Sequence, residues 1–293
     1  MVHHNLAGGN TPKLLRSGVT LFFLLLLHLG VRSQTALESY NAGYALELKK
    51  DYPAAIEKYN RAISHDPSNA LYIFRRGWSY MQLKNYKTAC KDFRKSIRLN
   101  AQDNRPYHDL GWILEEQGKL HRAIKFYKRS LGVDPQYVRS LLGLGNCYAH
   151  LKKYDRAIEQ MTRAIELYPN EAQHYNTRGN YKNLKGSYSD ALQDLQHAVQ
   201  LDSNYAYAYN NMGFSLTRLG KYEEAKQKIL LSLFFNPDNA YAYKNMALLY
   251  LAMNNQADAC PYLHQALSVS FKEFLNKEEE KRCKQLIKTN CTD

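Results

Sequence analysis

Residues 138–171 read VRSLLGLGNCYAHLKKYDRAIEQMTRAIELYPNE, and the same pattern recurs along the chain with a 34-residue period. A glycine marks the spacing in six consecutive units: Gly43, Gly77, Gly111, Gly145, Gly179 and Gly213. A small residue follows twelve positions later, at Ala55, Ala89, Ala123, Ala157, Ala191, Ala225 and Ala259. Proline closes several units, at Pro67, Pro135, Pro169 and Pro237. A fixed period of this length predicts stacked helical hairpins.

Each unit contains two predicted amphipathic helices. In the first helix a bulky residue lies four positions before the glycine and another lies three positions after it, as Leu141 and Tyr148 do in the quoted unit. These separations place both side chains on one helical face. The small residues fit contact points where neighbouring helices approach closely, because larger side chains there would overpack the interface. The sequence therefore predicts an all-α fold.

The pattern resembles the tetratricopeptide repeat family over residues 36–273. The resemblance divides this part of the chain into seven units: 36–69, 70–103, 104–137, 138–171, 172–205, 206–239 and 240–273. It implies a right-handed superhelical solenoid of seven TPR helix-turn-helix repeats, followed by a C-terminal capping helix and tail over residues 274–293. The chain departs from the pattern at several positions. Leu120 and Gln256 replace the inter-helix tyrosine, and Ala101 and Ser203 replace the closing proline. Lys182 stands at an apolar slot, Ala247 replaces the last glycine, and Pro261 falls inside the last second helix. We expect Pro261 to delay the start of that helix.

Residues 1–33 lie outside the repeats. Lys13 and Arg16 precede an apolar run from Val19 to Leu29, and Gly30-Val31-Arg32-Ser33 follows, with Val31 and Ser33 suited to cleavage. This order is typical of a secretory signal peptide, and it predicts cleavage before Gln34. The run is shorter than the roughly 20 apolar residues of a membrane span, although an uncleaved N-terminal membrane anchor is the alternative. We therefore expect an extracytoplasmic protein, periplasmic or secreted, or one anchored with its repeats outside the cytoplasm.

The chain carries a formal net charge of +13, and loss of residues 1–33 would lower it by three. Much of the excess lies on predicted second helices, at Lys84, Lys87, Lys91, Arg94, Lys95 and Arg98, and then at Lys119, Arg122, Lys125, Lys128 and Arg129. One interpretation is a solvated face that keeps the protein soluble. The other is attraction to an anionic surface or envelope polymer. Nucleic acid is not expected as a partner, because no nucleic-acid-binding module is recognised.

The five cysteines fall into two groups. Cys90 and Cys147 occupy apolar repeat positions and are expected to behave as small buried hydrophobes. Cys260, Cys283 and Cys291 cluster near the C-terminus. If the chain turns near residues 270–272, Cys260 and Cys283 lie level on the two sides of that turn, which favours a Cys260–Cys283 disulfide. The pair Cys260–Cys291 remains the alternative. Exported bacterial proteins of the resembled family often end with such a pair.

The sequence contains no recognisable catalytic or metal-binding constellation. GxSxG, HExxH and GxxxxGK[ST] motifs are all missing, and the histidines are scattered without metal-ligand spacing. Gly143-Leu144-Gly145 lacks the third glycine of a dinucleotide loop and lies within a predicted helix. We therefore expect a protein that is not an enzyme, without catalytic residues, metal or cofactors.

The resemblance instead implies a binding surface, because first helices in the family line a concave groove that holds peptides. The residues that would face this groove are Tyr40, Tyr44, Phe74, Trp78, Trp112, Asn176, Asn180, Asn210, Asn211, Lys244 and Asn245. Asparagine amides can donate to and accept from a peptide backbone, and aromatic rings supply interface area. Local packing is the alternative role for both kinds of residue. A clamp for a C-terminal carboxylate, as in some relatives, is disfavoured because its third-unit Lys and Arg are missing.

The sequence thus predicts an exported, non-enzymatic protein–protein interaction scaffold that binds a peptide or protein partner in the concave groove. A membrane-tethered subunit of an envelope complex is the first alternative. An accessory binder of anionic envelope polymer, acting through the basic convex face, is the second.

Overall fold

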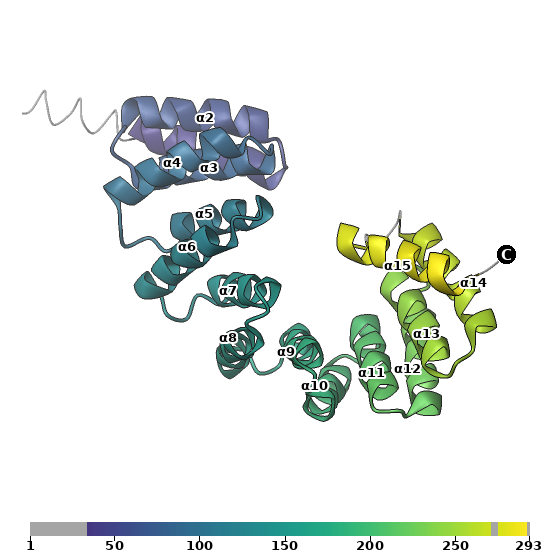
Figure 1. Ribbon diagram of the computed structural model, residues 1–293. Helices are drawn as coiled ribbons and strands as arrows, with labels where there is room; N and C mark the ends of the chain where they lie inside the picture. Colours follow the sequence, from purple (N-terminus) through teal and green to yellow (C-terminus); the bar gives the residue numbers. More distant parts are fainter. Residues whose placement is uncertain (1–33, 271–274, 292–293) are drawn as a thin grey trace, which may run out of the picture. The chain divides into compact units, whose positions relative to one another are not determined.

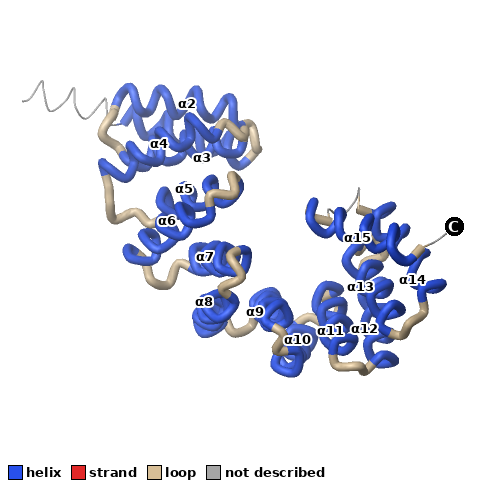
Figure 2. Tube along the Cα trace, in the orientation of Figure 1, coloured by secondary structure: helices blue, strands red, loops and turns tan. Residues whose placement is uncertain are grey.

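The computed structural model describes residues 34–270 and 275–291. Every regular element in this part of the chain is a helix, as Figure 2 shows. The predicted N-terminal signal or anchor over residues 1–33 lies outside the described residues. None of the helices that the structure describes combines the length and hydrophobicity that a membrane crossing requires.

The chain forms two compact units, residues 1–113 and residues 114–293, and the division falls inside α5. The first unit contains a helix over residues 34–48, then α2 (Tyr52–His65), α3 (Ala70–Gln82), α4 (Tyr86–Leu99) and most of α5 (Arg105–Glu116) (Figure 1). Its core is built from large side chains on both kinds of helix. Tyr59, Ile73, Phe93 and Leu110 are among those almost completely buried.

The second unit begins with the end of α5 and continues, within the described residues, through ten further helices. These are α6 (Leu120–Val133), α7 (Val138–His150), α8 (Tyr154–Leu167), α9 (Ala172–Lys185), α10 (Tyr188–Leu201), α11 (Ala206–Arg218), α12 (Tyr222–Phe235), α13 (Ala240–Ala252), α14 (Gln256–Val269) and α15 (Lys277–Asn290). Consecutive helices pack as antiparallel pairs along the unit (Figure 1). Buried alanines of the second helices, such as Ala157, Ala191 and Ala225, lie at the contacts between helices.

The 34-residue period sets the helix boundaries closely. Every second helix begins at the same point of the period, at Tyr52, Tyr86, Leu120, Tyr154, Tyr188, Tyr222 or Gln256, and each is 14 residues long. The turn before each one contains a residue with positive φ at the same repeat slot: Lys50, Lys84, Gly118, Lys152, Gly186, Gly220 and Asn254. The prediction of an all-α repeat solenoid is confirmed, and the described residues contain seven helix pairs followed by α15.

The predicted effect of Pro261 is wrong. Helix α14 begins at Gln256, in register with the other second helices, and contains Pro261 in its interior. Asn255 caps the helix by accepting a hydrogen bond from the Asp258 N–H at 3.1 Å. The proline ring is exposed, while Ala259 and Leu263 are buried on the opposite side. The N-cap and this apolar face therefore hold the helix despite the proline.

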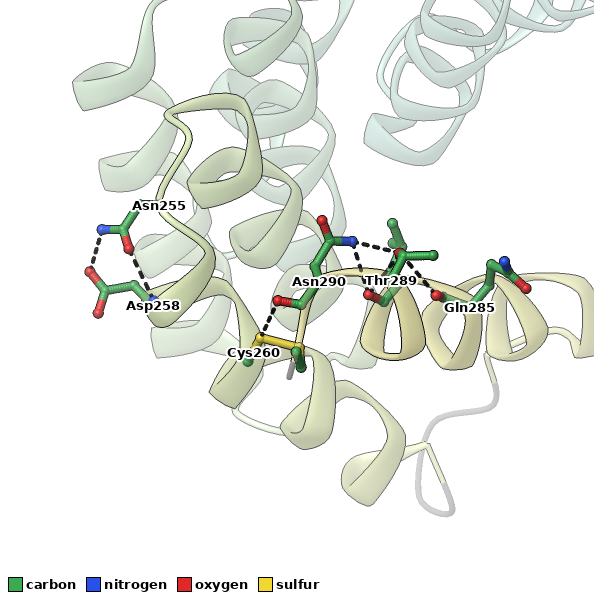
Figure 3. The surroundings of a disulfide bond; sticks show 8 residues. Asn255, Asp258, Cys260, Gln285, Thr289 and Asn290 are labelled. Carbon is green, nitrogen blue, oxygen red and sulfur yellow. Dashed lines mark hydrogen bonds between the residues drawn. A yellow bond between two sulfur atoms is a disulfide. The ribbon is translucent and has the colours of Figure 1, made fainter. Parts of the chain in front are cut away.

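The predicted Cys260–Cys283 disulfide is also wrong, because the structure joins Cys260 to Cys291 instead (Figure 3). Helix α14 ends at Val269 and α15 begins only at Lys277, so the connection is longer and lies later than expected. The end of α15 therefore reaches α14, and Cys260 Sγ lies 3.6 Å from the Asn290 carbonyl oxygen. Cys283 is completely buried in the core between α13, α14 and α15.

The repeat period explains why Cys283 points inward. It lies one full period after Leu249, in the slot two positions after the repeat glycine. From the second repeat onward every residue in that slot is buried: Ser79, Ile113, Cys147, Tyr181, Ser215, Leu249 and Cys283. Helix α15 thus packs as the first helix of an incomplete eighth unit, and its last turn carries Cys291 to Cys260.

Candidate functional site

The first helices of the second unit share a stripe of residues on one face, which we call the first-helix stripe. It contains the slots six and two positions before the repeat glycine and one and five positions after it, which lie on one side of a helix. These slots hold Arg139, Gly143, Asn146 and His150 on α7; Gln173, Thr177, Asn180 and Leu184 on α9; Tyr207, Asn211, Phe214 and Arg218 on α11; and Tyr241, Asn245, Leu248 and Ala252 on α13.

Four of the predicted groove asparagines bind one another instead of facing solvent. Asn211 Nδ2 donates to Asn176 Oδ1 at 2.9 Å, which links α11 to α9. Asn245 Nδ2 donates to Asn210 Oδ1 at 2.8 Å, which links α13 to α11 in the same way. Asn176, Asn210 and Asn245 are buried, and Asn211 is half-buried. These amides therefore hold successive first helices together, and both contacts join side chains of neighbouring repeats.

A fifth asparagine that the sequence analysis did not select belongs to the same network. Asn183 Nδ2 donates to the Asn211 carbonyl oxygen at 3.2 Å, and its Oδ1 accepts from Ser215 Oγ at 2.7 Å. The 34-residue period could have indicated it, because Asn183 lies at the slot that Glu47 and Glu115 occupy in other units. Asn180, in contrast, is half-buried and remains reachable on the stripe.

Lys244 is also engaged within the fold. Its Nζ lies 2.8 Å from Glu279 Oε2 on α15 and 5.2 Å from the centre of the Tyr241 ring. Because the lysine is buried, the Glu279 carboxylate supplies the partner that an interior ammonium needs. Lys244 therefore fastens α15 to α13, and the structure does not leave its charge open to a ligand.

The predicted aromatic groove residues of the first unit pack against other helices. Tyr40 stacks on Tyr72 with 5.0 Å between ring centres, and Phe74 is buried with its ring 5.8 Å from that of Phe93. The Arg75 guanidinium lies 4.7 Å from the centre of the Tyr44 ring. Phe74 is therefore a core residue, and the two tyrosines are only half exposed.

The two tryptophans serve a recurring contact between consecutive repeats. Trp78 meets Tyr52 edge-on with 5.9 Å between ring centres, and Trp112 meets Tyr86 at 6.1 Å. Phe214 makes the same contact with Tyr188 in the second unit, at 6.2 Å. In these three repeats the residue directly after the repeat glycine is aromatic. Its ring packs against the tyrosine at the start of the preceding second helix.

Part of the first-helix stripe is nevertheless open. Leu184 is 51% exposed and Tyr207 is 41% exposed, which is high for large apolar side chains. Asn146 and Gln173 are exposed on α7 and α9. The stripe therefore offers one aliphatic and one aromatic side chain among hydrogen-bonding groups, and this composition is common at protein interfaces.

Charged pairs fix the orientation of first against second helices at two equivalent places. Arg76 binds Asp92 through two hydrogen bonds of 2.8 and 2.7 Å, and Arg178 binds Asp194 through two of 2.9 and 2.7 Å. Lys182 adds a third contact to Asp194, at 2.8 Å. This contact explains the departure at Lys182, because the buried carboxylate of Asp194 gives the lysine a partner at an otherwise apolar slot.

The outer faces of the second helices differ sharply in character. On α6 and at its N-cap the cations Lys119, Arg122, Lys125, Lys128 and Arg129 are exposed, as the interpretation of a solvated basic face requires. On α12 the exposed residues include Leu230, Leu231 and Phe234, the last at 76%, beside Glu223, Glu224 and Gln227 nearer its start. This apolar face was not predicted from the sequence. The period could have shown it, because the same slots hold Gln196, His197 and Gln200 on α10 and Thr162, Arg163 and Glu166 on α8.

Within the residues that the structure describes, no group of three or more His, Cys, Asp or Glu side chains is arranged to hold a metal ion.

Comparisons with known proteins agree with the repeat architecture. Family descriptions entitled "Tetratricopeptide repeat" match residues 70–103 and 108–172, and one entitled "TPR repeat" matches residues 179–220. No curated protein matches the chain.

Solved structures show the same fold at low sequence identity. A tetratricopeptide repeat protein from Parabacteroides merdae is 17% identical, with a TM-score of 0.68 and coverage of 86% of this chain and 98% of that one. The C-terminal part of a TPR repeat-containing protein from Cytophaga hutchinsonii is 17% identical, with a TM-score of 0.61 and coverage of 83% and 98%. A thermophilic TPR protein from Thermus thermophilus is 20% identical, with a TM-score of 0.53 and coverage of 63% and 98%.

Proposed function

Since this chain belongs to the tetratricopeptide repeat family, we propose that it is a non-enzymatic scaffold that binds a peptide segment of a protein partner along its first-helix stripe. The family consists in general of interaction modules. The chain adds no catalytic motif to the repeats. Its role is therefore to position a partner rather than to transform a substrate.

The proposal is supported by a difference between two groups of residues on the first-helix stripe and beside it. Asn176, Asn210 and Asn245 hold the helices together, whereas Leu184 and Tyr207 remain exposed. Exposed apolar groups set in a rigid polar frame are favourable anchors, because little conformational entropy is lost when a partner covers them. A bound segment would contact Leu184 and Tyr207 with its side chains and would reach Asn180 and Gln173 with its backbone.

We also propose that the protein acts outside the cytoplasm. The support is the charged start and short apolar run of residues 13–33, together with the bond between Cys260 and Cys291. The mature chain would then begin at Gln34. Mass spectrometry of the N-terminal peptide of the native protein tests this, and an N-terminus at Met1 or Val2 in the membrane fraction would favour the membrane anchor instead.

The binding proposal is tested with the partner that the mature protein captures from its native source. Leu184→Ala and Tyr207→Ala should each weaken the affinity by about 1–3 kcal/mol in isothermal titration calorimetry. The matched control combines Lys125→Ala, Lys128→Ala and Arg129→Ala on the outer face of α6. This control should mainly slow association and reduce its salt dependence.

The opposite pattern would contradict the proposal. If the α6 variant loses binding while the two stripe variants keep the affinity of the parent, the partner is recognised as an anionic surface through the outer face. Circular dichroism and urea unfolding of each variant show whether a loss of binding comes from a loss of folding.

A further inference from the structure

A buried glutamate, a tyrosine and an arginine form a closed group in the first unit. Glu47 is only 6% exposed, and it accepts hydrogen bonds from Tyr59 Oη at 2.7 Å and from Arg75 at 2.9 Å. The Arg75 guanidinium also lies 4.7 Å from the centre of the Tyr44 ring. The carboxylate of Glu47 is thus neutralised by a cation of the same chain.

Two repeats later the same glutamate and tyrosine recur without the arginine. Glu115 and Tyr127 occupy the repeat slots of Glu47 and Tyr59, and the Tyr127 hydroxyl donates to the Glu115 carboxylate. The slot of Arg75, however, is filled by Gly143.

The slot that Gly143 fills, two positions before the repeat glycine, supplies a partner for the preceding first helix in other repeats. The slot four positions after the glycine meets a slot on the next first helix in two described cases: Glu47 binds Arg75, and Asn183 binds the carbonyl of Asn211. The same step from Glu115 leads to Gly143, which has no side chain. Because the slot of Arg75 belongs to the first-helix stripe, Gly143 lies on that stripe.

The ring of Tyr127, which is completely buried, packs against Gly143 and takes up part of the space of the absent side chain. A Cβ at residue 143 would lie 2.4 Å from Tyr127 Cζ and 2.7 Å from its hydroxyl oxygen. Any side chain there would displace the tyrosine that donates to Glu115. Glu115 is half-buried, whereas Glu47 is buried.

The remaining neighbours of Glu115 do not replace the guanidinium. Cys147 donates a weak hydrogen bond from its thiol, and burial next to Glu115 raises the pKa of Cys147 to about 12, so that it stays protonated. The charge of His150 lowers the pKa of Glu115, and the Tyr181 hydroxyl is bound to Asn146. Burial raises the pKa of Glu115 even though Tyr127 and Cys147 donate to it. A bound cation would reverse this effect.

We propose that the Glu115 carboxylate, oriented by the buried Tyr127, binds an arginine side chain of the polypeptide that lies along the first-helix stripe, as Glu47 binds Arg75 in the first unit. The inference rests on the proposed function and adds a specific side chain to it. A guanidinium fits because it donates charge-assisted hydrogen bonds to a carboxylate. Within this chain Arg75 Nη1 makes such a contact with Glu47 Oε1 at 2.9 Å. The overall positive charge of the chain opposes cationic partners at long range. The contact therefore contributes to selectivity and lifetime rather than to the association rate.

The test uses the full mature chain and two short acetylated alanine peptides. One peptide carries a single arginine and the other a citrulline, which has the same shape without the charge. Titrations are followed through the amide signals of Gly143 and Leu144 by nuclear magnetic resonance. The arginine peptide should bind about tenfold more tightly than the citrulline peptide, because a hydrogen bond to a charged partner contributes more than one to a neutral partner.

Two variants locate the effect. Glu115→Gln should abolish the preference for arginine. Glu47→Gln is the matched control and should leave the preference intact, because that carboxylate is already occupied by Arg75. Equal binding of both peptides by the parent, binding of neither peptide, or a preference that survives in a folded Glu115→Gln variant would overturn the inference.

If Glu115→Gln fails to fold, the comparison of the arginine and citrulline peptides on the parent protein still tests the inference, because that comparison needs no variant. Failure here is distinct from failure of the proposed function. A partner whose affinity depends on Leu184 and Tyr207 would keep the stripe as the binding surface even if arginine is not preferred over citrulline.

Discussion

Residues at one repeat slot differ in how tightly they are packed, although the sequence shows them as equivalent. A Cβ added to Gly213 would lie 2.3 Å from Ile229 Cγ1 and 3.2 Å from the Ala225 carbonyl oxygen. At Gly145 the nearest atoms would be 3.6 Å away, an ordinary contact. The glycine is therefore required by a neighbouring side chain at one position and is dispensable at the other.

Substitution of these two glycines by alanine should have opposite effects on stability. Gly213→Ala should lower the free energy of unfolding by about 1–3 kcal/mol, because the new methyl group overpacks the contact with α12. Gly145→Ala should leave it unchanged or raise it by up to about 1 kcal/mol, since alanine favours helix more than glycine does. Urea unfolding followed by circular dichroism measures both, and equal losses at the two positions would contradict the packing described here.

The hydrogen-bond partners of individual side chains could not be predicted from the sequence. The period and the small residues were sufficient to predict the helix pairs. They were not sufficient to predict that Asn211 binds Asn176 rather than a ligand, because that contact depends on how far each repeat is rotated against the next. A binding role for Asn180, Trp78 and Trp112 stays a prediction. Buried Phe74 and Asn210, in contrast, cannot offer their side chains to a partner without local opening.

At the scale of elements, α15 is held by two separate devices: the Cys260–Cys291 bond at its end and the Lys244–Glu279 pair near its start. The error about Cys283 arose from treating this helix as a cap that folds back on α14. Counting one period onward from Leu249 would have placed Cys283 in the buried slot. The 34-residue repeat therefore continues into α15, beyond the last repeat glycine.

Peptide mapping without reduction should accordingly find Cys260 linked to Cys291, with Cys283 unmodified by iodoacetamide until the protein is unfolded. Burial raises the pKa of the Cys283 thiol, which further lowers its reactivity. Cys291→Ser should cost about 2–4 kcal/mol, given the 31-residue separation of the bonded cysteines. A peptide linking Cys260 to Cys283 would refute this arrangement of α15.

The Glu115 cluster should give the stability of the second unit a recognisable pH dependence. The titratable groups around Glu115 are Glu116 on α5, Tyr127 on α6, Cys147 and His150 on α7 and Tyr181 on α9. Burial raises the pKa of Glu115 above the ordinary glutamate value of about 4.3. Between these two pKa values the folded state keeps a proton on Glu115 that the unfolded state has lost. The contribution of Glu115 to stability is therefore largest below the ordinary pKa and declines as the pH rises through the raised value.

Urea unfolding of the parent and of Glu115→Gln across the acidic to neutral range measures this contribution as a difference. The parent should lose stability relative to the variant as the pH rises through the acidic range. A parent that gains stability over Glu115→Gln toward neutral pH would mean that the carboxylate is stabilised by the fold, and the site would then need no external cation.

At the scale of the whole molecule, the two surfaces of the second unit have different chemistry. Its first helices present Leu184, Tyr207 and amide groups, while its second helices present cations on α6 and apolar residues on α12. We propose that partner recognition belongs to the first-helix stripe. Basic residues of the outer face contribute solubility and a general attraction for anions.

The most direct test of this assignment is site-specific photo-crosslinking to the captured partner. A benzoylphenylalanine at position 146, 180 or 207 places the reactive group on the stripe, and one at position 196 or 230 places it on the outer faces of α10 and α12. Each position is exposed or half-buried, so the substitutions are compatible with the fold. We expect covalent adducts with the partner from the three stripe positions and none from the two outer ones. Adducts formed only from positions 196 and 230 would contradict the assignment of binding to the first-helix stripe.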